Sequence, residues 1–533
     1  MKKLIQDNLF IFIFAICLLL LTLLMYLPSF RLNFSLIDDG LTIKYSREII
    51  HLLLRFNISS VAEIIFEANN GRVRPAYWLV QLLISSLSFY SPQIMHGFRL
   101  AVLFLSSYLI FSILGKLGVS IRWKLFSLFL FVMNSGNFES FYRLGPAEVY
   151  LGIYFLLIIN TVLKNKLGRF DYFLVLFSSF LGCFTKETFF IVSLPLILFL
   201  LPTKTKFVKR NRRLFLFILL INLFLGLLVF LIKQNYGMVS GYSQNYVFTP
   251  VTVIDNFENY FTQINHFQFP VIFILALYSA YRVFINLKKR FKRVESKDLI
   301  LLFFIIESVL NLAVLLPWRF VLGRYLILVN LSLIFAFAIA LENVWKLAKH
   351  KIIITPSKLT LLGNSFLVLL TPFIFIRNIF PIANLQLWQK TESETTISLL
   401  RSLATHIPIN EEVFVNYAKG DANIEVFLET GWHLEEFYNR RDIVFNYLDK
   451  SNLCADKERY ILDRTTERFM SEGKIINNKN LLLIDSGRST YNPINYGEVL
   501  KSFIRVKKSD LWSQEYKFDW FLYKQKSGTC LLV

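Results

Sequence analysis

Two adjacent carboxylates, Asp38 and Asp39, follow closely on an N-terminal apolar segment, in the stretch SLIDDGLTI. A carboxylate can take a proton from a hydroxyl group while the hydroxyl oxygen attacks a carbon centre. The same pair, followed by Gly40, could instead cap a helix, because Asp is a good N-cap residue and Gly suits turns. Which alternative holds depends on the other charges that share their side of a membrane.

Further charged residues occur in short connectors between apolar segments. They are Arg72 and Arg74 in GRVRPAYW, Glu139, Arg143 and Glu148 in NFESFYRLGPAEVY, Lys186 and Glu187 in CFTKETFF, and Arg319, Arg324 and Tyr325 in PWRFVLGRYL. Each has a plainer explanation: arginines can extend to lipid headgroups, and Glu139 and Arg143 have the spacing of a helical ion pair. Gathered in one place, the cations could stabilise the charge that develops on a departing phosphate.

The composition indicates a polytopic α-helical membrane protein. The chain has 533 residues, of which 55% are hydrophobic, and its mean hydropathy is +0.50. Runs such as 9–27 and 325–345 are long enough to cross a hydrocarbon core of ~30 Å. The first run follows Lys2 and Lys3 and lacks a small-x-small cleavage site, so we interpret it as an uncleaved signal anchor.

The net charge of +21 is explained by the connectors expected of a membrane protein. The basic residues gather in connectors between apolar segments, at 204–213, 288–293 and 346–351. Cytoplasmic loops of membrane proteins carry such an excess of Lys and Arg. No basic run belongs to a recognisable nucleic-acid-reading module, so nucleic acid is not an expected partner.

About eleven spanning helices are predicted from length and apolar composition. They cover 8–27, 98–117, 122–136, 147–163, 170–184, 187–201, 213–233, 269–286, 298–316, 322–344 and 358–380. If the N-terminus lies inside, every strongly basic connector also falls inside. The first loop, 28–97, then lies outside, and the short apolar segment 75–90 is expected to be an interfacial helix on the outer surface.

The chain is therefore predicted to consist of a transmembrane module, 1–380, and a small extracytoplasmic α/β or α+β domain, 381–533. Strands are predicted at 411–418, 424–430, 442–448, 481–485 and 520–524, and helices at 395–406 and 457–472. Cys454 and Cys530 could pair in this domain, although their spacing gives no support for a bond. No Cys/His grouping has zinc spacing.

The order of these short motifs resembles that of the GT-C membrane glycosyltransferases, which include protein O-mannosyltransferases and aminoarabinose transferases. The matching elements are Asp38-Asp39 with Ile43, Arg74-Pro75, Glu139 to Arg143, Lys186-Glu187 and the later GRYL at 323–326. They are most similar to the tetratricopeptide-linked O-mannosyltransferase branch. The chain departs from that branch at Ala76, where the branch has Leu, and in lacking its repeats. The resemblance covers roughly residues 1–380.

The resemblance implies that the protein transfers a sugar from a dolichyl- or undecaprenyl-type phosphate carrier to an acceptor on the extracytoplasmic face of a plasma or inner membrane. Asp38 is the favoured catalytic base and Asp39 its competitor. The donor phosphate is expected at Arg72, Arg74, Arg143, Lys186, Arg319 and Arg324, and further substrate contacts at Glu139, Glu148, Glu187 and Tyr325. The acceptor stays open between protein, lipid and glycan. No cofactor is predicted, and a metal is not assumed because metal use varies within the fold.

Two alternatives remain. One is a surface-polysaccharide polymerase or ligase that uses lipid-diphosphate glycans. The other is a transporter or flippase, which should show polar residues in mid-membrane and broken helices in related halves. In mid-membrane the sequence has mainly Glu307 and a few asparagines, which are Asn160, Asn222, Asn311 and Asn330. An ionisable group such as Glu307 costs roughly 3 kcal/mol or more in hydrocarbon, so it is either bonded within the bundle or part of a polar path.

Overall fold

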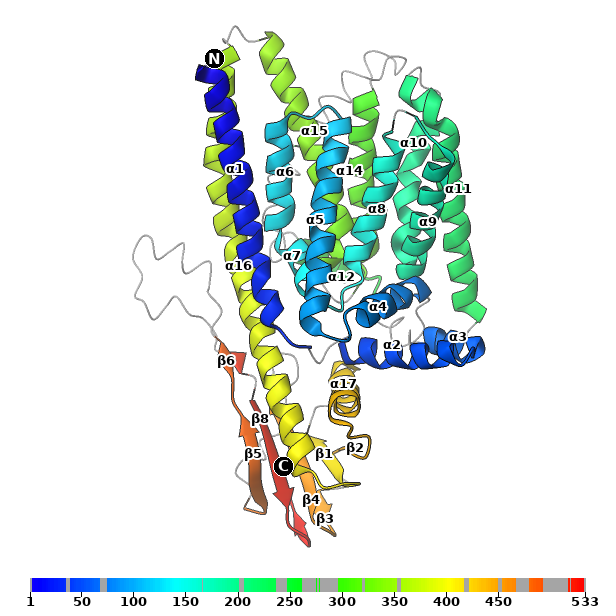
Figure 1. The fold of residues 1–533 in the computed structure, drawn as a ribbon, viewed down its shortest axis with the longest axis vertical. Helices are drawn as coiled ribbons and strands as arrows, with labels where there is room; N and C mark the ends of the chain where they lie inside the picture. Colours follow the sequence, from blue (N-terminus) through cyan, green and yellow to red (C-terminus); the bar gives the residue numbers. More distant parts are fainter. Residues whose placement is uncertain are drawn as a thin grey trace. The chain divides into compact units, whose positions relative to one another are not determined.

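The fold is known from a computed structural model, which describes most of the chain (Figure 1). The described residues are 2–34, 39–67, 74–164, 166–200, 206–235, 247–260, 275, 278, 296–318, 322–351, 356–416, 421–448, 453–465, 479–491, 516–517 and 519–531. The chain forms two compact units. The first comprises Met1–Leu27, Ile58–Val80 and Gly97–Ile382, and the second Pro28–Asn57, Gln81–His96 and Ala383–Val533.

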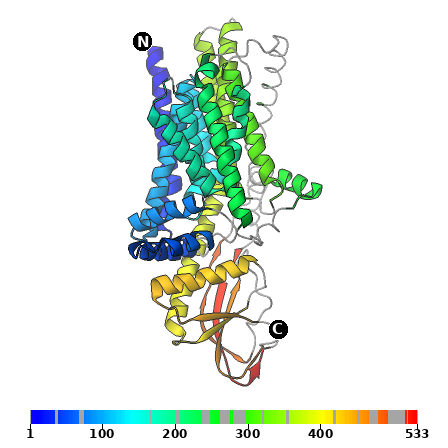
Figure 2. The ribbon, with the colours of Figure 1, turned by 90° about the vertical axis from the view of Figure 1, so that its right-hand side faces the viewer.

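The first unit is a bundle of α-helices that run side by side (Figures 1 and 2). Its elements are α1 (Lys2–Tyr26), α3 (Ile58–Glu67), α6 (Ile121–Met133), α7 (Ser135–Tyr142), α8 (Glu148–Val162), α9 (Arg169–Thr185), the 3-10 helix η2 (Glu187–Leu196), α10 (Ile197–Leu200), α11 (Lys206–Asn235), α12 (Pro250–Asn259), α14 (Ser296–Leu315), the 3-10 helix η5 (Gly323–Leu326) and α15 (Ile327–Lys351). Three α-helices have residues in both units: α4 (Pro75–Leu87), α5 (Pro92–Lys116) and α16 (Pro356–His406).

In the described part of the chain, six helices are long and apolar enough to cross a membrane: Leu9–Arg31, Pro92–Lys116, Asn211–Ile232, Lys297–Leu315, Gly323–Leu347 and Gly363–His406. The chain is therefore a multi-pass membrane protein. The helices found at the predicted spans 122–136, 147–163, 170–184 and 187–201 are shorter, and most of the span 269–286 lies outside the described residues. The number of eleven spans stays a prediction.

Helix α15 forms the centre of the bundle. Its apolar stretch is 89% buried, and it packs against α14, α6 and α8. The predicted helix at 122–136 is instead interrupted at Asn134, whose side chain accepts a hydrogen bond from the backbone N–H of Asn137 at 3.0 Å and starts α7. The predicted α-helix at 187–201 was also wrong in type, because most of it is the 3-10 helix η2.

The second unit contains a five-stranded mixed sheet (Figure 2). Its helices are η1 (Leu27–Arg31), α2 (Asp39–Leu54), the end of α16 and α17 (Asp421–Tyr438), and its strands are β1 (Glu412–Asn416), β2 (Val444–Tyr447), β3 (Cys454–Ala455), β4 (Arg459–Thr465), β5 (Leu481–Gly487), β6 (Thr490–Tyr491), β7 (Tyr516–Lys517), β8 (Asp519–Gln525) and β9 (Thr529–Cys530). The strand order is β2-β1-β4-β8-β5. Strand β1 is parallel to β2 and β4, whereas β8 is antiparallel to β4 and β5.

The central strands are buried on both faces. One face packs Val413, Leu462 and Leu522 against Leu403 of α16 and Leu434 of α17. The opposite face gathers a smaller apolar cluster: Leu448, Ile461, Phe521, Tyr523 and Leu531. Burial on both faces removes the polar and apolar alternation that marks a half-exposed strand.

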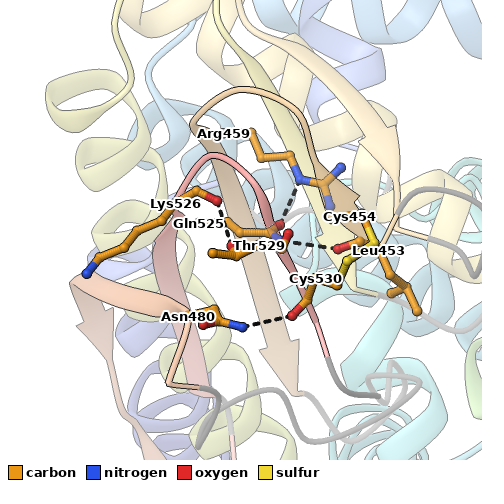
Figure 3. The surroundings of a disulfide bond; sticks show 8 residues. All are labelled: Leu453, Cys454, Arg459, Asn480, Gln525, Lys526, Thr529 and Cys530. Carbon is orange, nitrogen blue, oxygen red and sulfur yellow. Dashed lines mark hydrogen bonds between the residues drawn. A yellow bond between two sulfur atoms is a disulfide. The ribbon is translucent and has the colours of Figure 1, made fainter.

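A disulfide between Cys454 and Cys530 joins the two short strands β3 and β9, where the cysteines are register partners (Figure 3). The buried Gln525 side chain lies beside it. It accepts a hydrogen bond from Arg459 Nε at 2.8 Å and donates to the carbonyls of Leu453 at 3.1 Å and Thr529 at 2.7 Å. The Gln525 amide thus ties β9 and the residue before β3 to the end of β8.

Two predictions for the C-terminal region were wrong. Residues 424–430 lie in helix α17, where the buried residues Glu429, Thr430, His433 and Leu434 have helical spacing. Within the predicted helix 457–472, residues 459–465 form strand β4, and 466–472 lie outside the described residues. The predicted helix 395–406 is the last part of α16, which continues from the predicted span 358–380 without a break.

Candidate functional site

The predicted site residues fall into three groups. Asp38, Arg72 and Arg319 lie outside the described residues. Asp39 is the first residue of α2 in the second unit, and the position of its side chain is not described. The others, Arg74, Glu139, Arg143, Glu148, Lys186, Glu187, Arg324 and Tyr325, all belong to the first unit and are described.

Glu139 joins two arginines that are far apart in the chain. Its Oε1 atom lies 3.4 Å from Arg143 Nη1 and 3.4 Å from Arg324 Nη1. The second contact bridges 185 positions in sequence. Glu139 and Arg143 are therefore more than a local helical pair, because the carboxylate also connects α7 to η5.

Lys186 links a second carboxylate, that of Glu148, to the group around Arg324. Its Nζ donates a hydrogen bond to Glu148 Oε1 at 2.9 Å and lies 4.3 Å from the centre of the Tyr325 ring. The guanidinium of Arg324 lies 5.6 Å from the same ring. Tyr325 thus contacts both cations, and the described residues Arg143, Lys186, Arg324, Glu139, Glu148 and Tyr325 form one group, called here the cation cluster.

Arg74 and Glu187 form a neighbouring pair. Arg74 Nε lies 3.7 Å from Glu187 Oε2. Arg74 directly precedes α4, and Glu187 is the first residue of η2, next to Lys186 in sequence. The start of α4 is thereby connected to the connector that supplies the lysine of the cation cluster.

The cluster residues sit where helices begin or end. Arg143 is the C-cap of α7, Glu148 is the first residue of α8, and Lys186 is the C-cap of α9. Polar and charged side chains concentrate at such positions because an apolar span ends where its chain meets water or headgroups. Glu148 also lies at a helix N-terminus, where a negative charge is favourable.

Close backbone contact positions Glu139 relative to Arg324. A Cβ atom built on Gly136 would lie 2.4 Å from the carbonyl oxygen of Gly323, so only glycine allows α7 and η5 to approach this closely. Asn330 of α15 adds a buried anchor. Its Nδ2 donates to Asn134 Oδ1 at 3.0 Å and to Asn137 Oδ1 at 2.9 Å.

Two residues that hold the connector between α7 and α8 were not predicted. Tyr77 donates its hydroxyl to Gly145 O at 2.8 Å. Arg99 is 3% exposed and donates to Pro146 O at 3.1 Å and to Leu144 O. An arginine inside a predicted span, as in HGFRLAVLF, is itself a signal, because such a charge must find partners within the protein.

The cluster is enclosed but not sealed. Arg143 is 3% exposed, whereas Glu139, Lys186 and Arg324 are 14%, 14% and 12% exposed. Three cations against two carboxylates leave a net charge of +1. Lys186 Nζ carries three donors and makes one hydrogen bond to the described residues, so it can bond to an incoming anion.

The polar residues inside the spans bond to their neighbours. Asn222 donates to Ser179 Oγ at 3.0 Å, and Asn160 Oδ1 accepts from Ser112 at 3.1 Å. Glu307 is fully buried and accepts from Asn311 at 2.6 Å within α14. Asn330 belongs to the buried anchor described above. Such bonds are ordinary interhelical contacts in membrane proteins, and none of these residues needs a transport path to explain it.

In the part of the chain that the structure describes, no three His, Cys, Asp or Glu side chains gather in a way that could hold a metal ion. The absence of a cofactor stays a prediction.

Two solved structures of ArnT from Cupriavidus metallidurans are similar to the chain. The apo state shares 13% identity and a TM-score of 0.48, and the state bound to undecaprenyl phosphate shares 11% identity and a TM-score of 0.44. Each alignment covers 84% of this chain and 92% of the ArnT chain. No family model and no curated protein matches the chain. Both TM-scores are below 0.5, so the function proposed for this chain rests on its own residues.

Proposed function

We propose that the protein is an integral-membrane glycosyltransferase that moves a sugar from a polyprenyl-phosphate carrier to an acceptor on the extracytoplasmic face. The cation cluster is the observation that carries this proposal. Arg143, Lys186 and Arg324 come from three separate connectors and meet at the ends of apolar helices. A phosphate attached to a lipid needs such a place, with cations at the headgroup level beside an apolar bundle for the tail.

In the proposed reaction, the carboxylate of Asp38, or of its competitor Asp39, takes the proton of the acceptor hydroxyl. The acceptor oxygen forms a bond to the anomeric carbon, and the bond from that carbon to the phosphate oxygen breaks. The electron pair stays on the phosphate, whose charge increases. Lys186 and Arg324 stabilise this charge, because their carboxylate partners already hold them in place before the reaction.

The remaining predicted residues keep their proposed roles. Arg74, with Arg72 and Arg319, adds positive charge for the donor phosphate, while Glu139, Glu148, Glu187 and Tyr325 orient the cations and contact the sugar. The acceptor is a protein, a lipid or a glycan.

The disulfide supports the proposed orientation. Structural disulfides persist in oxidising compartments and are rare in the cytosol. The Cys454–Cys530 bond therefore favours a C-terminal domain outside the cytoplasm. The distribution of basic connectors favours the same orientation of the spans.

The proposal is tested by mass spectrometry of lipid-linked sugars and surface glycans in cells with and without the protein. Loss of the protein should leave one polyprenyl-phosphate sugar unused and one glycan missing. Cells carrying Asp38→Asn should show the same profile as cells lacking the protein, with normal amounts of the variant in the membrane. Full glycan levels in both Asp38→Asn and Asp39→Asn would rule out the proposed base.

A further inference from the structure

The chain on both sides of Asp38 and Asp39 is attached to the C-terminal domain. Before the pair, the backbone N–H of Asn33 donates to Ser393 Oγ of α16 at 2.9 Å, and the Phe34 ring stacks on Phe437 of α17 at 5.4 Å. All these residues belong to the second unit. The segment that leads into the acidic pair is thus held by the helices that cover the sheet.

After the pair, helix α2 makes two ion pairs with α17. Arg47 bonds to the carboxylate of Glu436 and donates to its backbone carbonyl at 3.1 Å. Lys44 Nζ lies 3.6 Å from Glu435 Oε2. Lys44 and Arg47 have the i, i+3 spacing that places side chains on one helix face. One face of α2 is therefore matched to two consecutive glutamates of α17.

Aromatic rings surround these ion pairs. The Arg47 guanidinium lies 4.6 Å from the Tyr90 ring centre and 5.9 Å from that of Phe437. Lys44 Nζ lies 5.7 Å from the Trp432 ring. Cations placed on aromatic faces gain additional attraction, and more so when water is displaced. The Glu436 side chain is only 10% exposed, so this pair is screened less by salt than a surface ion pair.

We propose that Glu435, Glu436 and Phe437 of α17 act as a clamp on α2, and that the C-terminal domain thereby positions the acidic pair for transfer. This inference rests on the proposed function. Asp39 is the first residue of α2, and the chain from Phe34 to Asp39 can span at most about 17 Å. Arg47 lies about two helical turns further along. The chain before and after the acidic pair is thus held by α16 and α17, so a movement of these helices would shift the start of α2.

The clamp makes Arg47 and Glu436 positioning residues. A small misplacement of a catalytic group can cost as much as about 100-fold in rate without weakening substrate binding. Releasing the clamp should therefore lower the turnover number and leave the KM for the donor unchanged. A movement of the C-terminal domain, for example when an acceptor binds, would shift the acidic pair, because α17 holds α2.

The test uses charge reversal in the full-length protein reconstituted in membranes. Arg47→Glu should lower kcat by about 10- to 100-fold, with donor KM within about twofold, and Glu436→Arg should do the same. The double variant, which restores the pair in reverse, should recover kcat to within about threefold. The matched control is Lys524→Glu, which breaks the Lys524–Glu458 pair of 2.5 Å on the sheet and should keep the wild-type rate. The milder Glu436→Gln tests the clamp if a reversal prevents folding.

Amide hydrogen exchange separates the clamp from the proposed activity. Exchange of the amides of α2 should be at least about 10-fold faster in Arg47→Glu than in the wild type or in Lys524→Glu, because local opening becomes easier. Exchange of α2 at the wild-type rate in Arg47→Glu would overturn the clamp. A double variant with a kcat as low as that of the single variants would also overturn it. A wild-type protein that transfers no sugar would contradict the proposed function, while the exchange result would still decide whether α17 holds α2.

Discussion

Glu139 forms ion pairs with two arginines, and Glu148 forms an ion pair with Lys186. The cation cluster as a whole carries a net charge of +1. Each carboxylate reduces the repulsion between neighbouring cations and fixes their positions. A cation that is already oriented stabilises developing negative charge without reorganisation at the moment of reaction. Removing Glu139 should therefore disturb Arg143 and Arg324 together, which a single local ion pair would not do.

His433 supplies a pH-dependent contribution to stability in the C-terminal domain. Burial lowers the pKa of His433 from 6.5 to about 4, and its Nδ1–H donates to the Glu429 carbonyl at 2.8 Å. Its Nδ1 also lies 3.9 Å from the Glu429 carboxylate, but the low pKa means that the imidazole is neutral at pH 7 and the contact is no ion pair.

The neutral imidazole should make the domain less stable at mildly acidic pH. The stabilising contribution is complete above pH 6.5 and is lost as the pH falls toward 4, because only the unfolded chain then takes up the proton. The loss is at most about 1.4 kcal/mol per pH unit. Amide exchange in β1 should accelerate between pH 7 and pH 5 in the wild type, after correction for the intrinsic exchange rate, and clearly less in His433→Gln. Equal acceleration in both proteins would contradict this assignment.

At the residue scale, the charged residues of the cation cluster could be predicted from the sequence. The buried residues that hold them in position could not. Glu139, Arg143, Lys186 and Arg324 stand out in sequence because they occur in short connectors between apolar segments. Asn134, Asn137 and Asn330 are equally important for position, yet a buried asparagine in sequence does not reveal which partner it will find. Their bonds depend on how α7 packs on α15.

At the scale of elements, the contact between α7 and η5 sets the distance between Glu139 and Arg324. Gly136 and Gly323 meet backbone to backbone, and a methyl group on Gly136 would lie 2.4 Å from a carbonyl oxygen. Neither partner can give way by rotating a side chain, because both are main chain. The two elements would have to move apart.

Gly136→Ala should therefore separate Arg324 from Glu139 and reduce sugar transfer by about 10-fold or more. The matched control is Gly431→Ala in α17, where a new Cβ would meet only the Phe445 ring, at 3.9 Å, and transfer should stay at the wild-type rate. Transfer rates of reconstituted variants, normalised to the amount of folded protein, measure the effect. Wild-type transfer by Gly136→Ala would show that this contact does not position the cluster.

Most strands of the sheet were predictable from short runs rich in apolar and aromatic residues, but strand β4 was not. Strands β1, β2, β5 and β8 lie at predicted positions. Strand β4 was missed: its neighbouring residues Leu462 and Ile461 belong to opposite apolar clusters, and its sequence shows no polar and apolar alternation. Within 424–430, polar and apolar residues alternate over a short stretch, which suggested a strand. Over the longer range of α17 the buried residues have helical spacing, and the segment is a helix.

At the scale of the whole molecule, the apolar helices and the mixed domain have different roles in the proposed reaction. The bundle contains the cation cluster, and the second unit contains Asp39 at the start of α2 and the clamp on that helix. The division of the chain is not simply sequential, since Pro28–Asn57 and Gln81–His96 group with the C-terminal residues. Sequence reasoning divided the chain at 380, because hydropathy reports membrane insertion and does not report which loops pack against a distant domain.

The most direct measurement of the central claim is the release of polyprenyl phosphate by the reconstituted protein from a polyprenyl-monophosphate sugar, with Lys186→Met compared with the wild type. Lys390, exposed on α16, provides the matched control Lys390→Met. If Lys186 stabilises the departing phosphate, Lys186→Met should release it about 100-fold or more slowly, while Lys390→Met keeps the wild-type rate. Release by Lys186→Met at the wild-type rate would contradict the role of the cation cluster.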